Sequence, residues 1–449
     1  MTAAHNLYDA LERIAATKSK NDKIEILKTL GDAEFGLIKR ALDPTVSYYV
    51  AKVAPPPSGA PLHTFGEPEL ELLDRLSSRQ VTGNEALAQI EAHMTSLDVK
   101  SREILKRIIE KNLKAGIGDT SVNKVRPGLI PVFPYMRCSL PKDSNIHKWD
   151  WTEGVYSQEK ADGMFSSATT DEFSRVTFAS RQGNPFPRGA LVELEDTFKD
   201  LGLSHQQMHG ELLVYENGVL LPREKGNGIL NSLMQGGDLP RYHRVAYEAW
   251  DMIPAEAAVD GGKYEVPYST RHKRLQDVVN TSTSNCLQVI ETEIVSSYAE
   301  AMEHYRRKLA QGKEGTILKY AHAPWRDGDS KDQVKFKLEV DVDLKIIGFL
   351  PGEGKNEATF GSVVCRTEDD LLEVSVSGFT DAKRKEIHEQ RDAILGKIMA
   401  VRANQVMTPS TPESLHSLFL PRHVEIRQDK AQADTLQRVL DQFKAAVEA

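Results

Sequence analysis

The spacing of apolar residues changes twice along this 449-residue chain, near residues 130 and 340, and this change limits the folds that the chain can adopt. Residues 1–130 place apolar side chains three and four positions apart, which is typical of amphipathic helices. Residues 131–340 mix short β-rich runs with helical stretches, and residues 341–449 hold closely spaced β-rich runs before a helical tail at 430–448. A chain of this length accommodates about three domains. The sequence therefore predicts a multidomain α+β protein.

Two glycine- or proline-rich stretches interrupt these patterns. The run VAPPPSGAP at 53–61 predicts a rigid loop between helices. The run PGEGKNEATFG at 351–361 follows an expected strand, so we interpret it as a hairpin and not as a phosphate-binding loop. The pattern G-x-x-x-x-G-K-[ST] is absent from the chain, which argues against nucleotide binding of the P-loop kind.

The composition indicates a soluble globular protein. Hydrophobic residues make up 40% and charged residues 27% of the chain, outside the range of disordered proteins. No apolar run approaches the ~18 residues of a membrane helix, and the N-terminus lacks the apolar segment of a secretory signal. The three cysteines are too few for a disulfide framework or a zinc site. We therefore expect a cytoplasmic protein that makes no membrane contact.

The formal net charge of −8 hides a gradient along the chain. Residues 1–130 hold 18 Lys and Arg against 17 Asp and Glu, while residues 100–126 hold eight basic and three acidic residues. Within this segment we expect one helix that stops at Gly116, with an apolar face and basic residues beside it. The basic residues are Lys106, Arg107, Lys111 and Lys114. Because a local field decides phosphate binding, this segment is a candidate DNA-binding surface.

Lys160, in the run SQEKADGMF, is a candidate nucleophile. Most lysines are solvated surface charges, so this assignment depends on whether the chain also supplies what a reactive lysine needs. A lysine that attacks a phosphate must be partly neutral, and carboxylates must hold a divalent metal against the phosphate charge. Further cations must contact the phosphate oxygens, and a base needs an aromatic or aliphatic platform.

Residues of these kinds follow Lys160 in order along the chain. They are Arg181 before a turn, Glu211 and Glu314 beside glycines at expected strand starts, Trp250 within a strand-like run, and Lys335 and Lys337 in VKFK. Taken singly, each has an ordinary structural explanation: a turn carboxylate, a core tryptophan or an edge strand with alternating charge. The ordered set favours a nucleotide site.

The runs EKADGMF, SRQG, HGELLVYENG, AWDMIP, EGTILKY and KFK resemble the successive motifs of covalent nucleotidyltransferases, and the set is similar to that of ATP-dependent DNA ligases. The greatest likeness is to the ligases of T-even-type bacteriophages. It extends to SYYVAKVAPP and VRPGLIPVFPYM near the N-terminus, and to LFLPRHVEIRQDKAQAD near the C-terminus. The resemblance therefore spans nearly the whole chain.

The resemblance implies a helical DNA-binding domain at 1–130, a nucleotidyltransferase (ATP-grasp-like α+β) core at 131–340 and a C-terminal OB-fold β-barrel at 341–449. It implies a monomeric enzyme that seals nicks in double-stranded DNA with ATP and Mg²⁺, through a covalent lysyl-AMP and a DNA-adenylate. Such enzymes serve DNA replication, repair and recombination. For a phage-encoded protein, the compartment would be the host cytoplasm.

The resemblance also assigns roles. Lys160 would carry AMP, Glu211 and Glu314 would bind the ribose and Mg²⁺, and Lys335 and Lys337 would bind the α-phosphate. Trp250 and Ile317 would enclose adenine, and Gln158 would contact the edge of the base. Asp162 would support the loop, Arg181 would contact the nick phosphate, and pyrophosphate would be oriented by Arg427, Asp429 and Lys430.

One position departs from the family pattern. The motif K-x-D-G-x-R ends here in Phe165, which cannot donate hydrogen bonds, so Arg181 or another base would have to substitute. Two alternatives remain open at this stage. One is a different covalent nucleotidyltransferase, either an RNA ligase or an mRNA-capping enzyme. The other is a DNA-binding protein that has the fold without the chemistry.

Overall fold

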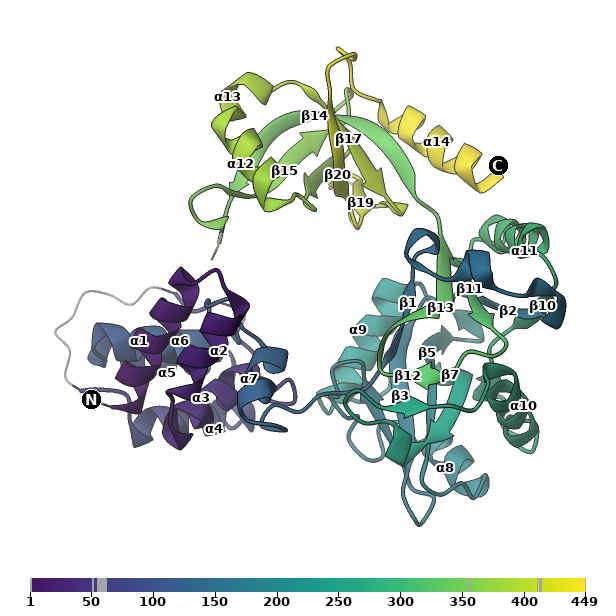
Figure 1. Cartoon of the computed structure of the whole chain (residues 1–449), viewed down its shortest axis with the longest axis horizontal. Coiled ribbons are helices and arrows are strands. Elements are labelled where there is room, and N and C mark those ends of the chain that lie inside the picture. Colours follow the sequence, from purple (N-terminus) through teal and green to yellow (C-terminus); the bar gives the residue numbers. More distant parts are fainter. Residues whose placement is uncertain are drawn as a thin grey trace. The chain divides into compact units, whose positions relative to one another are not determined.

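The computed structural model describes residues 2–50, 52–54, 63–353, 356–409, 411 and 414–448. The chain divides into two compact units, one of residues 1–133 with 179–185 and the other of residues 134–178 with 186–449 (Figure 1). The expected loop at 53–61 lies almost entirely outside the described residues. Among those described, no helix combines the length and apolarity needed to cross a bilayer.

The first unit is helical, as its sequence predicts. Its helices are α1 (Ala3–Ala16), α2 (Lys20–Lys28), α3 (Asp32–Leu42), α4 (Glu67–Ser77), α5 (Gly83–Ser96), α6 (Val99–Ile109) and α7 (Asp119–Val125). Helix α6 begins at an Asp98 N-cap, whose carboxylate accepts hydrogen bonds from the N–H groups of Lys100 and Ser101. Its apolar face is buried against α1 and α3 in one core, which confirms the predicted face.

The expected end of this helix at Gly116 is wrong. Helix α6 ends at Ile109, and Lys111 and Lys114 follow it with positive φ angles of 55° and 52°. The Lys111 ammonium accounts for the early stop, because it donates to the carbonyls of Arg40 (3.2 Å) and Asp43 (2.6 Å) and so ties the chain to the end of α3. Burial lowers the pKa of Lys111 to about 8.

The N-terminal part of the second unit contains two β-sheets. The first has the strand order β1-β13-β11-β2-β10 and the second the order β4-β3-β5-β7-β9, with β6 beside β5. The strands of the first are β1 (Met136–Ser139), β2 (Val155–Glu159), β10 (Thr292–Val295), β11 (Gly315–Tyr320) and β13 (Gly328–Lys337). Those of the second are β3 (Met164–Thr170), β4 (Val176–Ser180), β5 (Gln206–Glu216), β6 (Val219–Leu220), β7 (His243–Pro254) and β9 (Leu287–Val289). The chain passes from one sheet to the other between β2 and β3, at residues 160–163.

Helices flank these sheets. They are α8 (Val192–Asp200), α9 (Arg223–Met234), α10 (Tyr268–Val279) and α11 (Tyr298–Ala310), with 3₁₀ turns at Pro141–Asp143, Ile146–Lys148, Trp151–Glu153 and Ala255–Ala257, and a small ladder of β8 (Lys263–Tyr264) with β12 (Trp325–Arg326). Helix α9 packs on β5 and β3, while α10 packs on β7. The short β-rich runs at 174–180, 209–218, 244–253 and 314–320 form strands β4, β5, β7 and β11, which confirms the α+β interpretation of this part.

The C-terminal part of the second unit contains a five-stranded antiparallel sheet in the order β16-β15-β14-β17-β20. Its strands are β14 (Val340–Pro351), β15 (Phe360–Arg366), β16 (Glu373–Val376), β17 (Ile398–Ala403) and β20 (Arg422–Arg427), accompanied by α12 (Asp381–Glu389), α13 (Arg391–Ile394), the pair β18 (Gln405–Met407) and β19 (Ser417–Phe419), and the tail helix α14 (Leu436–Glu448). Pairing of Pro351 with Phe360 confirms the expected hairpin, of which residues 354–355 lie outside the description.

No closed barrel is found in this part of the described chain. The two edge strands, β16 and β20, meet only at a single bridge between Ser377 and Arg422. Strand β16 is four residues long, so it ends before a continuous ladder to β20 can form. The five-stranded sheet is therefore open, and its two edge strands approach each other at this one bridge.

A buried ion pair anchors α10 to β7. The Arg271 guanidinium donates to both oxygens of Asp251 (2.8 and 2.9 Å), and both residues are almost fully buried. Charge attraction to Arg271 holds the pKa of Asp251 below its usual range in spite of burial. Such a pair contributes little when both partners are present, but removal of one partner leaves a buried charge without compensation.

We expect Arg271→Met to lower the free energy of unfolding by about 3–5 kcal/mol. Arg274→Met is the matched control, because Arg274 is an exposed residue of the same helix and should change stability by less than about 0.5 kcal/mol. All four tryptophans lie in this unit, so denaturant unfolding followed by tryptophan fluorescence reports on it. Equal stabilities of the two variants would contradict the assignment.

Candidate active site

Lys160 lies in the four-residue crossing between the two sheets and is held from both its main chain and its side chain. Its N–H donates to the carbonyl of Gly315 (2.9 Å), and its ammonium forms an ion pair with the Glu314 carboxylate. Both partners come from the start of β11. The crossing loop therefore connects the nucleophile candidate directly to the predicted metal ligand Glu314.

Two glycines allow this close approach. Gly315 has a φ of +140°, and a Cβ there would lie 2.2 Å from the carbonyl oxygen of Phe336. At Gly163 a Cβ would lie 2.4 Å from the carbonyl oxygen of Leu212. A larger residue at Gly163 would push the loop away from β5, and one at Gly315 would push the start of β11 away from β13. The K-x-D-G and E-G patterns thus have a steric cause.

Glu211 closes the loop from β5. Its carboxylate accepts a hydrogen bond from the N–H of Gly163 (3.2 Å). Burial raises the pKa of Glu211 to about 8, and the negative charge of Glu314 adds to this effect, while the positive charge of Lys160 opposes it. The carboxyl is therefore mainly protonated at neutral pH, and an added cation would favour its ionised form.

The predicted adenine-binding residues come from both sheets. Trp250 is a half-buried residue of β7, and Ile317 is a half-buried residue of β11 that pairs in register with Gln158 of β2. The Gln158 amide is buried and donates to the hydroxyls of Tyr268 (2.8 Å) and Thr292 (3.0 Å). These bonds use its N–H groups and orient its carbonyl oxygen as a remaining acceptor.

Lys335 and Lys337 follow on β13, in register with Ile317 and Gly315 of β11. Lys335 is half-buried and has no salt-bridge partner among the described residues. Lys337 contacts Glu339 (3.2 Å) and Asn404 (3.3 Å), and burial lowers its pKa from the usual value. Both predicted phosphate-binding lysines therefore lie on β13, which pairs with β11, the strand to which the Lys160 loop is hydrogen-bonded.

Phe165, where a basic residue was expected, belongs to an aromatic cluster. Its ring makes an edge contact with Tyr135 (centroids 4.4 Å apart) and lies near Trp250 (6.0 Å) and His209 (6.2 Å). The residue supports the predicted adenine platform by packing. It supplies no charge.

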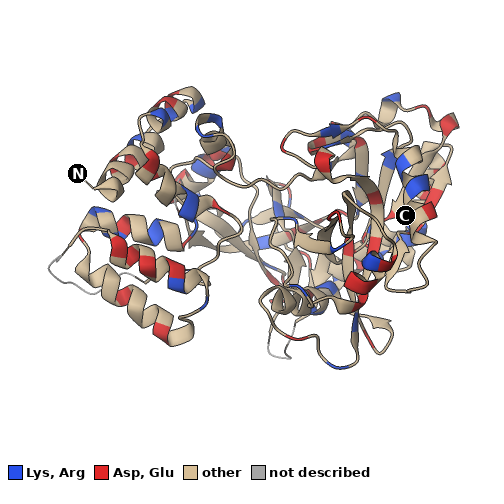
Figure 2. Ribbon diagram, turned by 90° about the horizontal axis from the view of Figure 1, so that it is seen from below, with Lys and Arg blue, Asp and Glu red and all other residues tan. Residues whose placement is uncertain are grey.

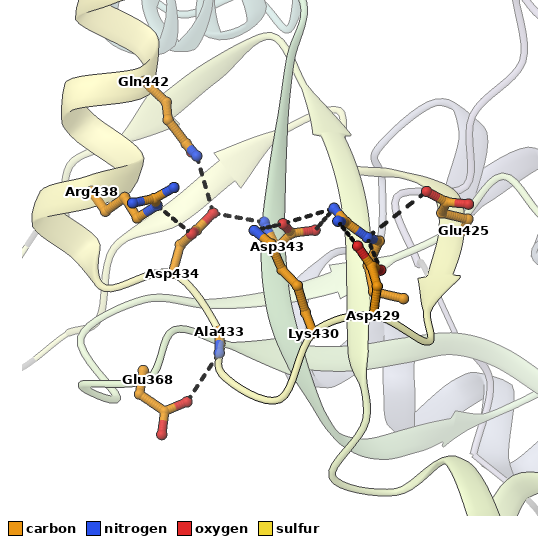
Figure 3. A network of polar contacts seen from close by, with 10 residues as sticks. Asp343, Glu368, Glu425, Asp429, Lys430, Ala433, Asp434, Arg438 and Gln442 are labelled. Carbon is orange, nitrogen blue, oxygen red and sulfur yellow. Dashed lines mark hydrogen bonds and ion pairs between the residues drawn. The ribbon is translucent and has the colours of Figure 1, made fainter.

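Arg427, Asp429 and Lys430 come together at the end of β20, around a carboxylate that the sequence did not single out (Figure 3). Asp343 of β14 accepts from the Arg427 guanidinium (3.0 Å) and pairs with Lys430, while Arg427 also binds Asp429 (2.6 Å). Hydrogen bonds from Arg427 lower the pKa of Asp429 to about 2. Asp343 itself is nearly buried.

The predicted DNA-binding residues differ from one another in their surroundings. Arg107 is buried and pairs with Glu12 (2.7 Å) and Glu103 (2.9 Å), and Lys111 is bound to main-chain carbonyls. Lys106 is half-exposed and has no salt-bridge partner among the described residues, and Lys114 is exposed and pairs loosely with Glu110 (3.7 Å) and Glu103 (4.0 Å). Acidic residues lie among the basic ones on these helices (Figure 2). Arg181 lies in the 179–185 segment of the first unit.

Two residues near Lys160 escaped the sequence analysis. Arg223 starts α9 and pairs with Asp162 (3.2 Å), and the Asn227 amide donates to the carbonyl of Gly163 (3.3 Å). The available signal was the basic run REKGNG after Pro222, a residue typical of helix starts. Within the described residues, no cluster of three or more His, Cys, Asp or Glu side chains forms a metal site.

Comparisons with known proteins agree with this geometry. Residues 144–337 match the family described as ATP dependent DNA ligase domain. The chain is 28% identical to the DNA ligase of Enterobacteria phage T4 over 96% of this chain and 98% of the phage protein. It is 27% identical to a DNA ligase of Halobacterium salinarum over 65% of this chain and 55% of that protein. The solved structure titled Pmar-Lig_PreS3 has the same fold, with a TM-score of 0.75, 22% identity and coverage of 94% of this chain and 99% of that one.

We expect the contribution of Glu211 to the stability of this unit to fall as pH rises from about 4.5 to about 8, because Glu211 is protonated in the folded chain and ionised in the unfolded one over that window. The variant Glu211→Gln has no carboxyl to ionise at this position. The difference between its free energy of unfolding and that of the wild type should therefore rise by about 1–3 kcal/mol from the lower to the upper end of this pH window. Fluorescence-detected unfolding at pH 5 and pH 8.5 measures the difference. An equal change for both proteins would place the ionisation elsewhere.

Proposed function

The chain belongs to the ATP-dependent DNA ligases, and from this premise we propose that Lys160 carries the adenylyl group from ATP to a nick in duplex DNA. The observation that supports this role is the fixation of Lys160 between the Gly315 carbonyl and the Glu314 carboxylate. A solvated surface lysine has no need of two fixed partners. A nucleophile does, since catalysis depends on a defined direction of attack.

The proposed ligation reaction has three steps. The Lys160 amine gives up a proton and attacks the α-phosphorus of ATP, so that a P–N bond forms and pyrophosphate leaves. An oxygen of the 5′-phosphate at the nick then attacks the same phosphorus, the P–N bond breaks, and the amine regains its proton. Finally the 3′-hydroxyl loses its proton and attacks the 5′-phosphate, and AMP leaves. A covalent intermediate divides one difficult transfer into two easier ones.

The neighbouring strands would bind the nucleotide. Trp250 and Ile317 would enclose adenine, and the free carbonyl oxygen of Gln158 would accept from the exocyclic amine of the base. Lys335 and Lys337 would contact the α-phosphate, where they stabilise the charge that develops in the transition state. The registers of β11 with β2 and β13 support this arrangement.

Glu211 and Glu314 fit a magnesium ion. Mg²⁺ is usually bound by one or two carboxylates together with substrate phosphates, so two carboxylates beside the Lys160 loop are a sufficient protein contribution. When bound, the ion would offset phosphate charge. Glu211, which is neutral without a cation, would ionise as it binds one.

We further propose the family architecture for the chain: a DNA-binding domain over 1–130, the nucleotidyltransferase core over 131–340 and an OB-type domain over 341–449. The helical first unit and the five-stranded C-terminal sheet support it. In the OB-type domain, Arg427, Asp429 and Lys430 would orient pyrophosphate. Arg181 would contact the nick phosphate.

The Lys160 assignment is tested by covalent labelling. We expect radiolabel from α-labelled ATP, but not from NAD, to attach to the protein in an acid-labile, alkali-stable bond. Lys160→Ala should abolish labelling, and so should Lys160→Arg, because a guanidinium stays protonated. Lys148→Ala is the control, since Lys148 is exposed in the same unit and should label normally. Labelling of Lys160→Ala would show that another residue is the nucleophile.

For the DNA-binding segment, we propose Lys106 and Lys114 as the phosphate contacts, while Arg107 and Lys111 also stabilise the helical unit. Lys106→Ala with Lys114→Ala should weaken binding to nicked DNA and flatten its log–log salt dependence by up to about 2 units, at about 0.9 for each contact. Lysyl-AMP formation should not change. Arg107→Ala and Lys111→Ala should instead lower the melting temperature. An unaltered salt slope in the double variant would leave these lysines as solvated surface charges.

A further inference from the structure

Helix α9 holds the Lys160 loop at its first turn. The Arg223 guanidinium lies 3.2 Å from an Asp162 oxygen, and one turn later the Asn227 amide reaches the carbonyl of Gly163. Arg223 is 39% exposed, and Asp162 is its one salt-bridge partner in the described part of the chain. The guanidinium also lies over the ring of Phe419, 5.6 Å from its centroid, a contact that uses no N–H donor. Because a guanidinium has five N–H donors, these two contacts leave most of them for a ligand.

The charge of the loop changes during the proposed reaction. Attachment of AMP to Lys160 removes the ammonium charge and adds a phosphate charge, a change of two units toward negative. Asp162, Glu211 and Glu314 surround the same loop, and the charge of Arg223 acts on two of them, Asp162 and Glu211. A second phosphate, that of the DNA 5′ end, must then approach the adenylated lysine. A cation that contacts the loop would favour this approach, in addition to the contact proposed above for Arg181.

Two other cations near the loop are engaged by a carboxylate or an aromatic ring, while Lys335 and Lys337 are assigned above to the α-phosphate. Lys313 pairs with Glu159 (2.6 Å), and Lys319 is buried, with its ammonium over the ring of Tyr268. Phe165, which follows the loop on β3, is packed against Tyr135 and donates nothing. Arg223 is the basic side chain that contacts the loop and still reaches solvent.

We propose, on the basis of the ligase function above, that Arg223 binds the 5′-phosphate at the nick during AMP transfer, exchanging the Asp162 carboxylate for a phosphate oxygen pair. A fork of two parallel N–H donors on a phosphate is stronger than one contact with a partly exposed carboxylate. Burial and the nearby charge of Glu314 both raise the pKa of Asp162, while the charge of Arg223 opposes this shift. Arg223 is therefore a substrate-binding residue for the second step.

The test compares nicked duplexes that carry either a 5′-phosphate or a 5′-hydroxyl at the nick. Full-length adenylated protein is mixed with each duplex in the presence of a chelator, so that transfer does not proceed. We expect the wild type to prefer the 5′-phosphate, and Arg223→Ala to lose about ten- to a hundredfold of that preference, the range for a charge-assisted hydrogen bond. Single-turnover AMP transfer should slow by about 10²–10³.

Lys225→Ala is the matched control, since it removes the same charge from an exposed position of the same helix turn. It should keep the full preference for the 5′-phosphate. Asp162→Asn removes the ion pair but retains the guanidinium, and should keep the preference too. If Asp162→Asn reproduced the loss seen in Arg223→Ala, Arg223 would act only through the loop, and the inference would be overturned.

Two further outcomes are decisive. If folded Arg223→Ala kept the preference for the 5′-phosphate nick, the role of Arg223 would be overturned. The ligase function would still stand if the wild-type protein was labelled by ATP and sealed nicked DNA. Absence of ATP labelling in the wild type would instead overturn the function itself. If Arg223→Ala does not fold, Arg223→Lys retains a charge without the fork. Its preference for the 5′-phosphate nick over the 5′-hydroxyl nick should be weaker than that of the wild type but should not be lost. An undiminished preference in Arg223→Lys would then count against the fork.

Discussion

The hydrogen bond from the Lys160 N–H to the Gly315 carbonyl joins the two sheets at the point where the chain crosses between them. Gly163 lets the loop lie against β5, and Gly315 lets β11 pair with β13, because a side chain at either position would collide with neighbouring main chain. The side chains of Glu314 and Glu211 then reach the same loop. Fixed main chain and convergent carboxylates therefore arise from one packing constraint, and the chemistry of the loop depends on it.

The same constraint sets the electrostatics of the unliganded site. Burial keeps the Glu211 carboxyl largely protonated, with a pKa of about 8, and Glu314 is neutralised by Lys160. A site in this state carries little net charge. A bound nucleotide would add the negative charge of its phosphates and the positive charge of its metal ion at the same time, so that Glu211 can ionise as the phosphates arrive. Ionisation of a carboxyl is in this way coupled to binding.

Much of the local structure could be predicted from the sequence, because it depends on patterns with a fixed period. The apolar face of α6 and the strands that carry Glu211, Trp250 and Ile317 follow from such patterns. The end of α6 did not, since Lys111 binds carbonyls about seventy residues away in the chain. Arg223 and Asp343 were missed for the same reason: their partners become neighbours only after folding.

Three of the proposed phosphate-binding cations share one arrangement that explains how they persist in a folded, unliganded protein. Arg223 pairs with Asp162, and Arg427 and Lys430 pair with Asp343. Each carboxylate orients its cation and offsets the repulsion between like charges in the absence of ligand. When a phosphate oxygen replaces the carboxylate oxygen, the cation exchanges one anionic partner for another of similar geometry, so little reorganisation is needed at the moment of reaction. The carboxylate released in each exchange becomes free to bind a metal ion, to accept a proton or to repel the departing anion.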